Sequence, residues 1–167
     1  MSALAQPSSG ESKATLDKPL EHLLACHQRI LERMSMLERA TAAAGEKPEE
    51  SAELIAKVLR FLDSNGAWHT EDEENSVFPR LAGKVGEDEV AYLNELTRQH
   101  EDLDAALDRF KAERSQANAA ALADGYRKHI AFEESRLGGI IKRVLSEEEF
   151  AAVSVEMKQR RGIESAC

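Results

Sequence analysis

The chain has few of the residues that interrupt helices. Its 167 residues include only four prolines and nine glycines, and these lie mostly between periodic segments or near their ends. Ala, Leu, Glu, Lys and Arg, which favour helix, are abundant. A chain of this length can bury one hydrophobic core, so we predict a single all-α domain.

Basic clusters, long apolar runs and a cysteine framework are also missing. The formal net charge is −9 and no basic block interleaves with aromatic residues, so we expect no nucleic-acid partner. No stretch approaches the roughly 18 apolar residues of a membrane span, and the N-terminal segment lacks the apolar part of a signal peptide. The two cysteines, Cys26 and Cys167, form no C-x-x-C pair. We therefore expect no membrane association and a reducing, cytoplasmic location.

Hydrophobic periodicity predicts a helical bundle. Residues 1–16 are rich in Ser, Gly and Ala and are expected to form a disordered tail. Helices are expected over about residues 17–44, 49–81, 87–114 and 119–144, with a weak point or kink at Asn65-Gly66. Their short links predict an up-down-up-down antiparallel four-helix bundle over residues 17–145. Within residues 146–167, Ser146 and Glu149 have the spacing of a capping box, which predicts a shorter additional C-terminal helix.

Polar residues interrupt the apolar stripe of each long helix. Each stripe follows three- and four-residue steps and is apolar on both sides of the interruption. The interrupting residues are His27 in the first helix, His69 with Glu73 in the second, His100 in the third, and His129 with Glu133 in the fourth. His22 shares a different face with Cys26 and is left out of this set.

All six side chains are expected at one level of the bundle. Residues equally far from a shared turn have similar heights in an antiparallel bundle, and the mismatches here are mostly within about one helical turn. A single histidine on an apolar stripe is usually a hydrogen-bonded core residue. Six buried polar groups would instead cost on the order of several kcal/mol without a compensating partner. We therefore interpret the set as a metal site.

The donor types restrict the metal. Imidazole and carboxylate suit iron, zinc and manganese. If Glu73 and Glu133 each bridge two ions, each ion has two nitrogen and two oxygen ligands, and a bridging oxide or hydroxide raises the number to five. One position then remains for dioxygen, peroxide, nitric oxide or water. A single zinc ion would have more donors than its usual tetrahedral number.

The order and spacing of these residues resemble the hemerythrin-like, HHE cation-binding family. Its pattern is a His on helix one, H-x-x-x-E on helix two, a His on helix three and H-x-x-x-E on helix four. The flank matches as well, because the family's helix-two ending resembles Glu73-Glu74-Asn75-Ser76-Val77-Phe78-Pro79. The resemblance covers about residues 17–145 and implies a four-helix bundle with a non-haem di-iron centre. Iron is preferred to manganese on this resemblance alone.

Two positions differ from the oxygen-carrying hemerythrins. Those proteins place a second histidine four residues after the helix-three His, where this chain has Asp104. They also place an Asp five residues after the helix-four His, whereas Glu133 follows His129 by four. Simple reversible oxygen carriage is therefore not expected. Asp104 is either an extra oxygen ligand or a polar residue at the stripe edge. Tyr126 either faces the metal or is a core aromatic.

Two hypotheses of function follow. The first is a cytoplasmic non-haem di-iron protein that binds a small ligand (dioxygen, peroxide or nitric oxide) for sensing, storage or detoxification. The second is an iron- or oxygen-responsive regulatory or interaction module whose folding is coupled to metal binding. The buried polar layer argues against a metal-free interaction protein. The sequence leaves open whether the protein is an enzyme and which protein it contacts.

Overall fold

The computed structural model describes residues 16–163, and every regular element in that range is a helix. The all-α prediction is therefore confirmed. The predicted tail and Cys167 lie outside the described residues, with the exception of Leu16. Its side chain is fully buried, and its carbonyl oxygen accepts a hydrogen bond from the Ser154 hydroxyl. At Leu16 the prediction of a disordered tail is wrong, because this residue packs into the core.

In the structure, the first two long helices both begin at a proline. α2 (Pro19–Ala42) leads through a tight turn to α3 (Pro48–Phe61). Proline is suited to a first helical turn, where its missing N–H would have no partner within the helix. From α3 the chain continues without a break through a series of short segments. They are η1 (Leu62–Gly66), α4 (Ala67–Glu71), η2 (Asp72–Val77) and α5 (Phe78–Ala82), where η marks a wide π-helical turn.

The sequence predicted an irregularity, though not its type, at one of the two π turns and none at the other. η1 coincides with the weak point predicted at Asn65-Gly66. η2 follows from the spacing of His69, Glu73 and Val77, which are four residues apart and all buried. In a straight α-helix of 3.6 residues per turn, each four-residue step drifts by about 40° around the axis. A π turn holds more residues and cancels that drift.

The third and fourth predicted helices are joined by a shorter link than expected. α6 (Glu87–Ala112) is followed by α7 (Gln116–Glu134). α7 begins at Gln116 because the Ser115 side chain caps it, accepting a hydrogen bond from the Asn118 amide at 3.1 Å. α7 ends ten residues before the predicted boundary at Val144, and α8 (Leu137–Val144) follows separately.

The break between α7 and α8 has a local cause. The Ser135 hydroxyl donates to the Phe132 carbonyl oxygen at 2.6 Å, a side-chain hydrogen bond that competes with the helix. The Tyr92 hydroxyl donates to the Glu133 carbonyl oxygen at 2.9 Å and so satisfies the end of α7. The prediction of one continuous helix through Val144 is therefore wrong at Ser135 and Arg136.

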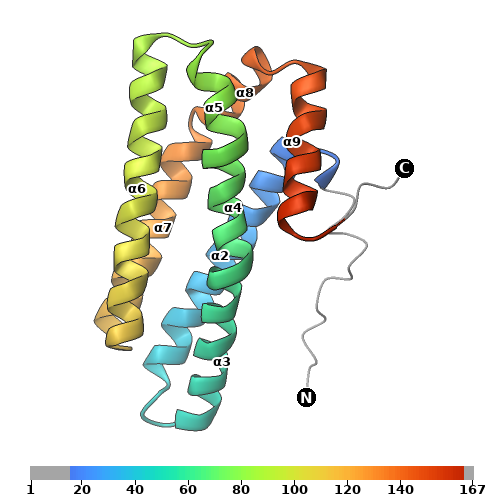
Figure 1. Cartoon of the computed structure of the whole chain (residues 1–167). Coiled ribbons are helices and arrows are strands. Elements are labelled where there is room, and N and C mark those ends of the chain that lie inside the picture. Colours follow the sequence, from blue (N-terminus) through green and yellow to red (C-terminus); the bar gives the residue numbers. More distant parts are fainter. Residues whose placement is uncertain (1–15, 164–167) are drawn as a thin grey trace.

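α9 (Glu147–Arg160) is the expected C-terminal helix. Its capping box is confirmed: the Ser146 hydroxyl accepts from the Glu149 amide, and the Glu149 carboxylate accepts from the Ser146 amide. α9 packs against η2 and α2 on one side of the molecule (Figure 1).

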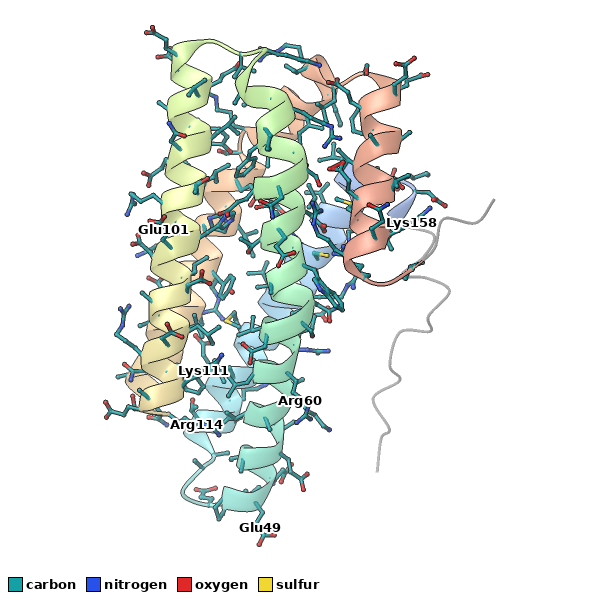
Figure 2. The ribbon with its side chains drawn as sticks, in the orientation of Figure 1. Glu49, Arg60, Glu101, Lys111, Arg114 and Lys158 are labelled. Carbon is teal, nitrogen blue, oxygen red and sulfur yellow. The ribbon has the colours of Figure 1, made fainter. Side chains whose placement is uncertain are left out.

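Two apolar clusters form the core. α2 packs against α3 and α7, and α6 packs against α7, so the long segments lie side by side (Figure 1). One cluster surrounds Met34 and Phe110, and the other surrounds Leu81 and Leu96. Charged side chains such as Glu49 and Glu101 point outward and are exposed (Figure 2). Within residues 16–163, no helix combines the length and apolarity that a membrane crossing needs.

Candidate metal centre

The structure brings all six predicted residues together between the two apolar clusters. Each is buried, with at most 6% of its surface exposed. Their potential ligand atoms form two groups, in each of which the atoms lie within 4.8 Å of one another. The first group is His27, His69, Glu73 and Glu133, and the second is Glu73, His100, His129 and Glu133. Because both glutamates belong to both groups, the arrangement offers two adjacent positions that could each hold a cation and that share two carboxylates.

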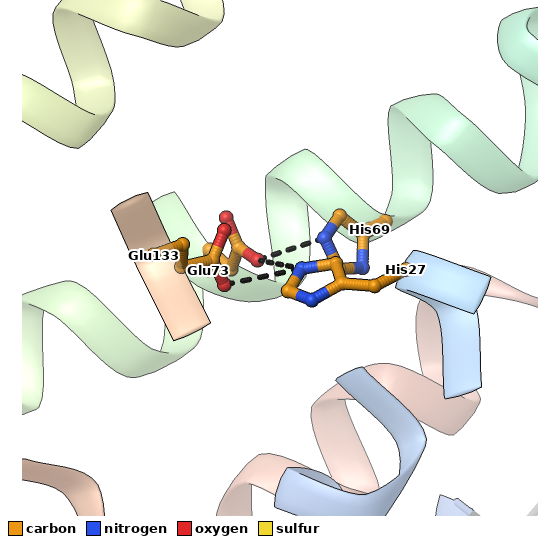
Figure 3. A group of neighbouring side chains, drawn as sticks. All are labelled: His27, His69, Glu73 and Glu133. Atoms are coloured by element: carbon orange, nitrogen blue, oxygen red, sulfur yellow. Dashed lines mark ion pairs between the residues drawn. The ribbon is translucent and has the colours of Figure 1, made fainter. Parts of the chain in front are cut away.

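The two oxygens of Glu73 point to different groups. Oε1 lies 2.8 Å from His69 Nε2, and Oε2 lies 3.0 Å from His100 Nε2. Glu133 is divided in the same way, with Oε1 3.3 Å from His27 Nε2 and Oε2 3.2 Å from His129 Nε2. Figure 3 shows the first group. Each carboxylate is thus placed to bridge the two positions.

Five helical elements supply these side chains. His27 lies on α2, His69 on α4, Glu73 on η2, His100 on α6, and both His129 and Glu133 on α7. The imidazoles pair edge to face across helices. Ring centroids are 4.8 Å apart for His27 with His69, and 4.7 Å apart for His100 with His129. Each cation position therefore receives two nitrogens from two different helices.

Several atoms of the centre are close to one another without forming hydrogen bonds. His27 Nε2, His100 Nε2, both oxygens of Glu73 and Oε2 of Glu133 have no hydrogen-bond partner among the described residues. A buried polar atom left in this state costs about 1–3 kcal/mol. A cation at each position would satisfy these atoms, and the mixed nitrogen and oxygen donors match those of iron, zinc or manganese sites. The residues present therefore fit a metal centre.

Three histidines form a hydrogen bond through Nδ1, on the side of the ring that faces away from the centre. In each, the Nδ1–H donates to a side-chain oxygen, so that Nε2 faces the centre. The pairs are His27 with Glu134 at 3.0 Å, His100 with Glu74 at 2.7 Å, and His129 with Gln99 at 2.9 Å. These oxygen partners fix both the tautomer and the direction of each ring.

Sequence reasoning did not identify these outer partners. Two of them are the second residues of the doublets Glu73-Glu74 and Glu133-Glu134. In each doublet the first carboxylate faces the centre, and the second meets a histidine of another helix. The repeated doublet, each time at the end of an H-x-x-x-E step, is the signal that could have indicated them.

The fourth histidine, His69, lies beside Cys26. The Cys26 thiol is buried and 3.4 Å from His22 Nε2. Burial alone would raise the pKa of the thiol, but its neighbours His22 and His69 lower it to about 5. The sequence placed Cys26 on a face away from the site. That placement is wrong in one respect, because the thiol neighbours a predicted ligand. His22 belongs to neither donor group.

Charge dominates the protonation of the centre. Burial alone would lower the pKa of His27, but the carboxylates of Glu133 and Glu73, at 3.3 and 3.9 Å from Nε2, raise it to about 10. Burial likewise opposes the charged form of His69, yet the charge of Glu73 raises the pKa of this imidazole well above its usual value. The pKa of Glu73 falls well below its usual value because the surrounding histidines outweigh its burial. Protons and metal cations therefore compete for the same nitrogens.

A small cavity adjoins one side of the centre. It has a volume of about 20 Å³, and three of the predicted ligands line it, namely His69, His100 and His129. That is room for about one water-sized molecule. A wider groove between α6 and α7 shares Leu103 and His129 with this cavity, and so lies next to it on the outside.

Asp104 and Tyr126 both line the small cavity beside His69, His100 and His129. Asp104 is exposed and belongs to neither donor group. Tyr126 packs against the apolar cluster around Met34, as expected for a core aromatic. Burial, reinforced by the charge of Asp104, raises the pKa of the Tyr126 phenol, so the hydroxyl keeps its proton at neutral pH.

Comparison with known proteins agrees with this geometry. The family profile described as Hemerythrin HHE cation binding domain matches residues 18–141, which is more than half of the chain and contains all six predicted residues. No curated protein matches the chain. α9 lies beyond the matched residues.

Proposed function

The chain belongs to the hemerythrin HHE cation-binding family, and from that premise we propose that it is a non-haem di-iron protein that binds a small ligand. The ligand is dioxygen, peroxide or nitric oxide. The observation that carries this proposal is the division of the two carboxylates. Glu73 and Glu133 each direct one oxygen toward His27 or His69 and the other toward His100 or His129. Two cations, rather than one, fit this arrangement.

Each side chain has a specific role in the proposal. His27 and His69 hold one iron, His100 and His129 hold the other, and Glu73 and Glu133 bridge them. Two irons held in this way supply redox chemistry and an open position for a small ligand. The carboxylates offset the positive charge that is buried with the metal. Glu74, Glu134 and Gln99 keep three of the imidazoles in the binding tautomer.

The proposal includes the antiparallel up-down-up-down order expected from the sequence. The contacts of α2 with α3 and α7, and of α6 with α7, support it. This order brings residues far apart in the chain to one level. His27 and Glu133, for example, approach to 3.3 Å.

The ligand position is proposed in the small cavity beside His69, His100 and His129. Its volume of about 20 Å³, room for about one water-sized molecule, favours a very small ligand. Tyr126 and Asp104 are among the polar residues of its wall. A protonated Tyr126 can donate a hydrogen bond to a bound ligand.

The test measures metal content per chain and near-ultraviolet absorption on the same sample after reconstitution with ferrous iron. We expect about two irons in the wild-type protein. Glu73→Gln removes the negative charge at nearly the same volume and should leave one iron or none. Glu101→Gln is the matched control, because Glu101 is exposed on α6. One zinc per chain, or unchanged iron in Glu73→Gln, would contradict the di-iron proposal.

A further inference from the structure

A second buried group of charges lies outside the metal centre and joins α9 to η2. Asp72, the residue before Glu73, has no exposed surface. Its carboxylate accepts hydrogen bonds from Arg160 Nη1 at 2.9 Å and from Arg161 Nη2 at 2.7 Å. Arg160 is the last residue of α9, and Arg161 follows it as the C-cap. The first residue of η2 is thus bound by two cations from another helix.

The same contacts continue at the other end of the π turn. Arg160 also donates to the Ser76 hydroxyl, and that hydroxyl donates to Glu156 at 3.2 Å. Arg80 donates to the Ser76 carbonyl oxygen at 2.8 Å and pairs with Glu156 at 2.7 Å. Asp72 and Ser76 are both fully buried. The contacts from α9 therefore fall on both sides of Glu73.

Stability alone does not account for these ion pairs. Burying a charge is expensive, and an apolar pair of similar volume often stabilises a core as well or better. A π turn is also rare and less regular than the α-helix around it. Fixed partners at both ends of η2 would hold the chain in that wider turn. The turn in question carries the carboxylate whose two oxygens face both halves of the metal centre.

We propose that Arg160 and Arg161 are positioning residues, which hold η2 so that Glu73 is presented to both cation positions. The proposal rests on the proposed di-iron function. It adds that metal retention depends on a helix outside the matched family domain, because α9 begins after residue 141. The chain also carries a reporter of α9 docking. Arg161 lies over the ring of Trp68, the only tryptophan, at 5.6 Å from its centroid.

The experiment compares Arg160→Ala/Arg161→Ala with Arg127→Ala. Arg127 makes a two-point ion pair with Glu38 between α7 and α2, at 2.8 and 3.0 Å, so its loss also removes an inter-helix charge contact. The first measurement is amide hydrogen exchange of residues 72–77 in the metal-free proteins. We expect exchange at least tenfold faster in the double variant, together with changed Trp68 fluorescence, and no change in the control.

The second measurement is the rate at which iron-loaded protein loses iron to a chelator, with the near-ultraviolet spectrum recorded before chelation. We expect roughly tenfold faster loss and an altered spectrum in the double variant only. Arg161 donates to both oxygens of Asp72, from Nη1 at 3.1 Å and from Nη2 at 2.7 Å. Arg161→Lys serves if the double variant does not fold, because lysine keeps the charge but not this two-point contact. It should show the same changes at smaller size.

Three results decide the matter. Unchanged exchange in residues 72–77 means that the arginines do not hold η2, which overturns the proposal. Faster exchange with unchanged iron loss and spectrum shows that Glu73 needs no such support, which overturns it as well. A wild-type protein that binds no iron refutes the proposed function. In that case the exchange comparison, made without metal, still decides whether the arginines hold the turn.

Discussion

For His27, burial and charge act on the pKa in opposite directions, and charge prevails. The imidazole is almost fully buried, with Glu133 at 3.3 Å and Glu73 at 3.9 Å from Nε2. Its pKa rises to about 10 from an ordinary value of 6.5. In the metal-free protein the positive charge of the protonated ring therefore offsets part of the negative charge of the two carboxylates, as a metal cation would. The folded state binds this proton more tightly than the unfolded chain does.

The metal-free protein should lose stability as pH rises. The contribution of a group with a raised pKa is fully present below its unfolded value, here about 6.5, and disappears as pH approaches the folded value of about 10. We expect the free energy of urea unfolding to fall by on the order of a few kcal/mol across that window. His27→Gln should flatten the dependence. The Cys26 thiol, whose pKa is lowered to about 5, contributes in the opposite direction, so the comparison between the two proteins is decisive. Equal pH dependence in the wild type and His27→Gln would show that His27 is not charged in the folded state.

At the scale of helices, the apolar stripes predicted which polar side chains meet in the core. A polar residue within a stripe must face the core, so His27, His100 and Glu133 could be assigned from periodicity alone. Glu74 could not. It is rotated by about 100° from Glu73 around the axis, and only the position of α6 shows that it reaches His100. Partners of this kind depend on how neighbouring helices are placed, which one helix's pattern does not contain.

The irregular parts of the helices were the hardest to predict. The capping box at Ser146 was recognisable because both of its partners lie within four residues of each other. The break at Ser135 depends on the side-chain rotamer of this serine, and the contacts of η2 with α9 join residues far apart in the sequence. The four-residue spacing of His69, Glu73 and Val77 was the one local sign of η2. A strict α-helix would have turned Val77 away from the core.

Gly66, in η1, tests whether a wide turn needs glycine. Its backbone angles are helical, φ −64° and ψ −44°, and an added Cβ would meet the Leu62 side chain at an ordinary 3.6 Å. Gly66→Ala should therefore stabilise the protein by about 0.5–1 kcal/mol, because alanine restricts the unfolded chain. Gly139→Ala in α8, where a Cβ meets nothing within 4 Å, is the matched control. Urea unfolding measures both. Destabilisation at Gly66 alone would mean that η1 requires glycine.

Across the whole molecule, the metal centre lies where the apolar core is interrupted. One apolar cluster includes Met34 and Phe110, the other includes Leu81 and Leu96, and the six polar residues are buried between them. The two apolar halves therefore meet through the centre rather than through direct hydrophobic packing. Because these six side chains lie on α2, α4, η2, α6 and α7, a metal bound by them would join all the long segments at one level.

Removing the metal should therefore affect the whole fold. Metal that binds only the folded state adds about 2.7 kcal/mol when its free concentration is 100 times Kd. For a chain of this size, that corresponds to roughly 5–10 °C in Tm. Calorimetry should show a lower and broader transition after iron is removed, because the two apolar halves then unfold less cooperatively. The Glu73→Gln/Glu133→Gln variant should show no difference between iron-treated and untreated samples. Equal Tm values for iron-loaded and metal-free wild-type protein would contradict this prediction. They would show that a bound metal does not stabilise the contact between the two apolar clusters.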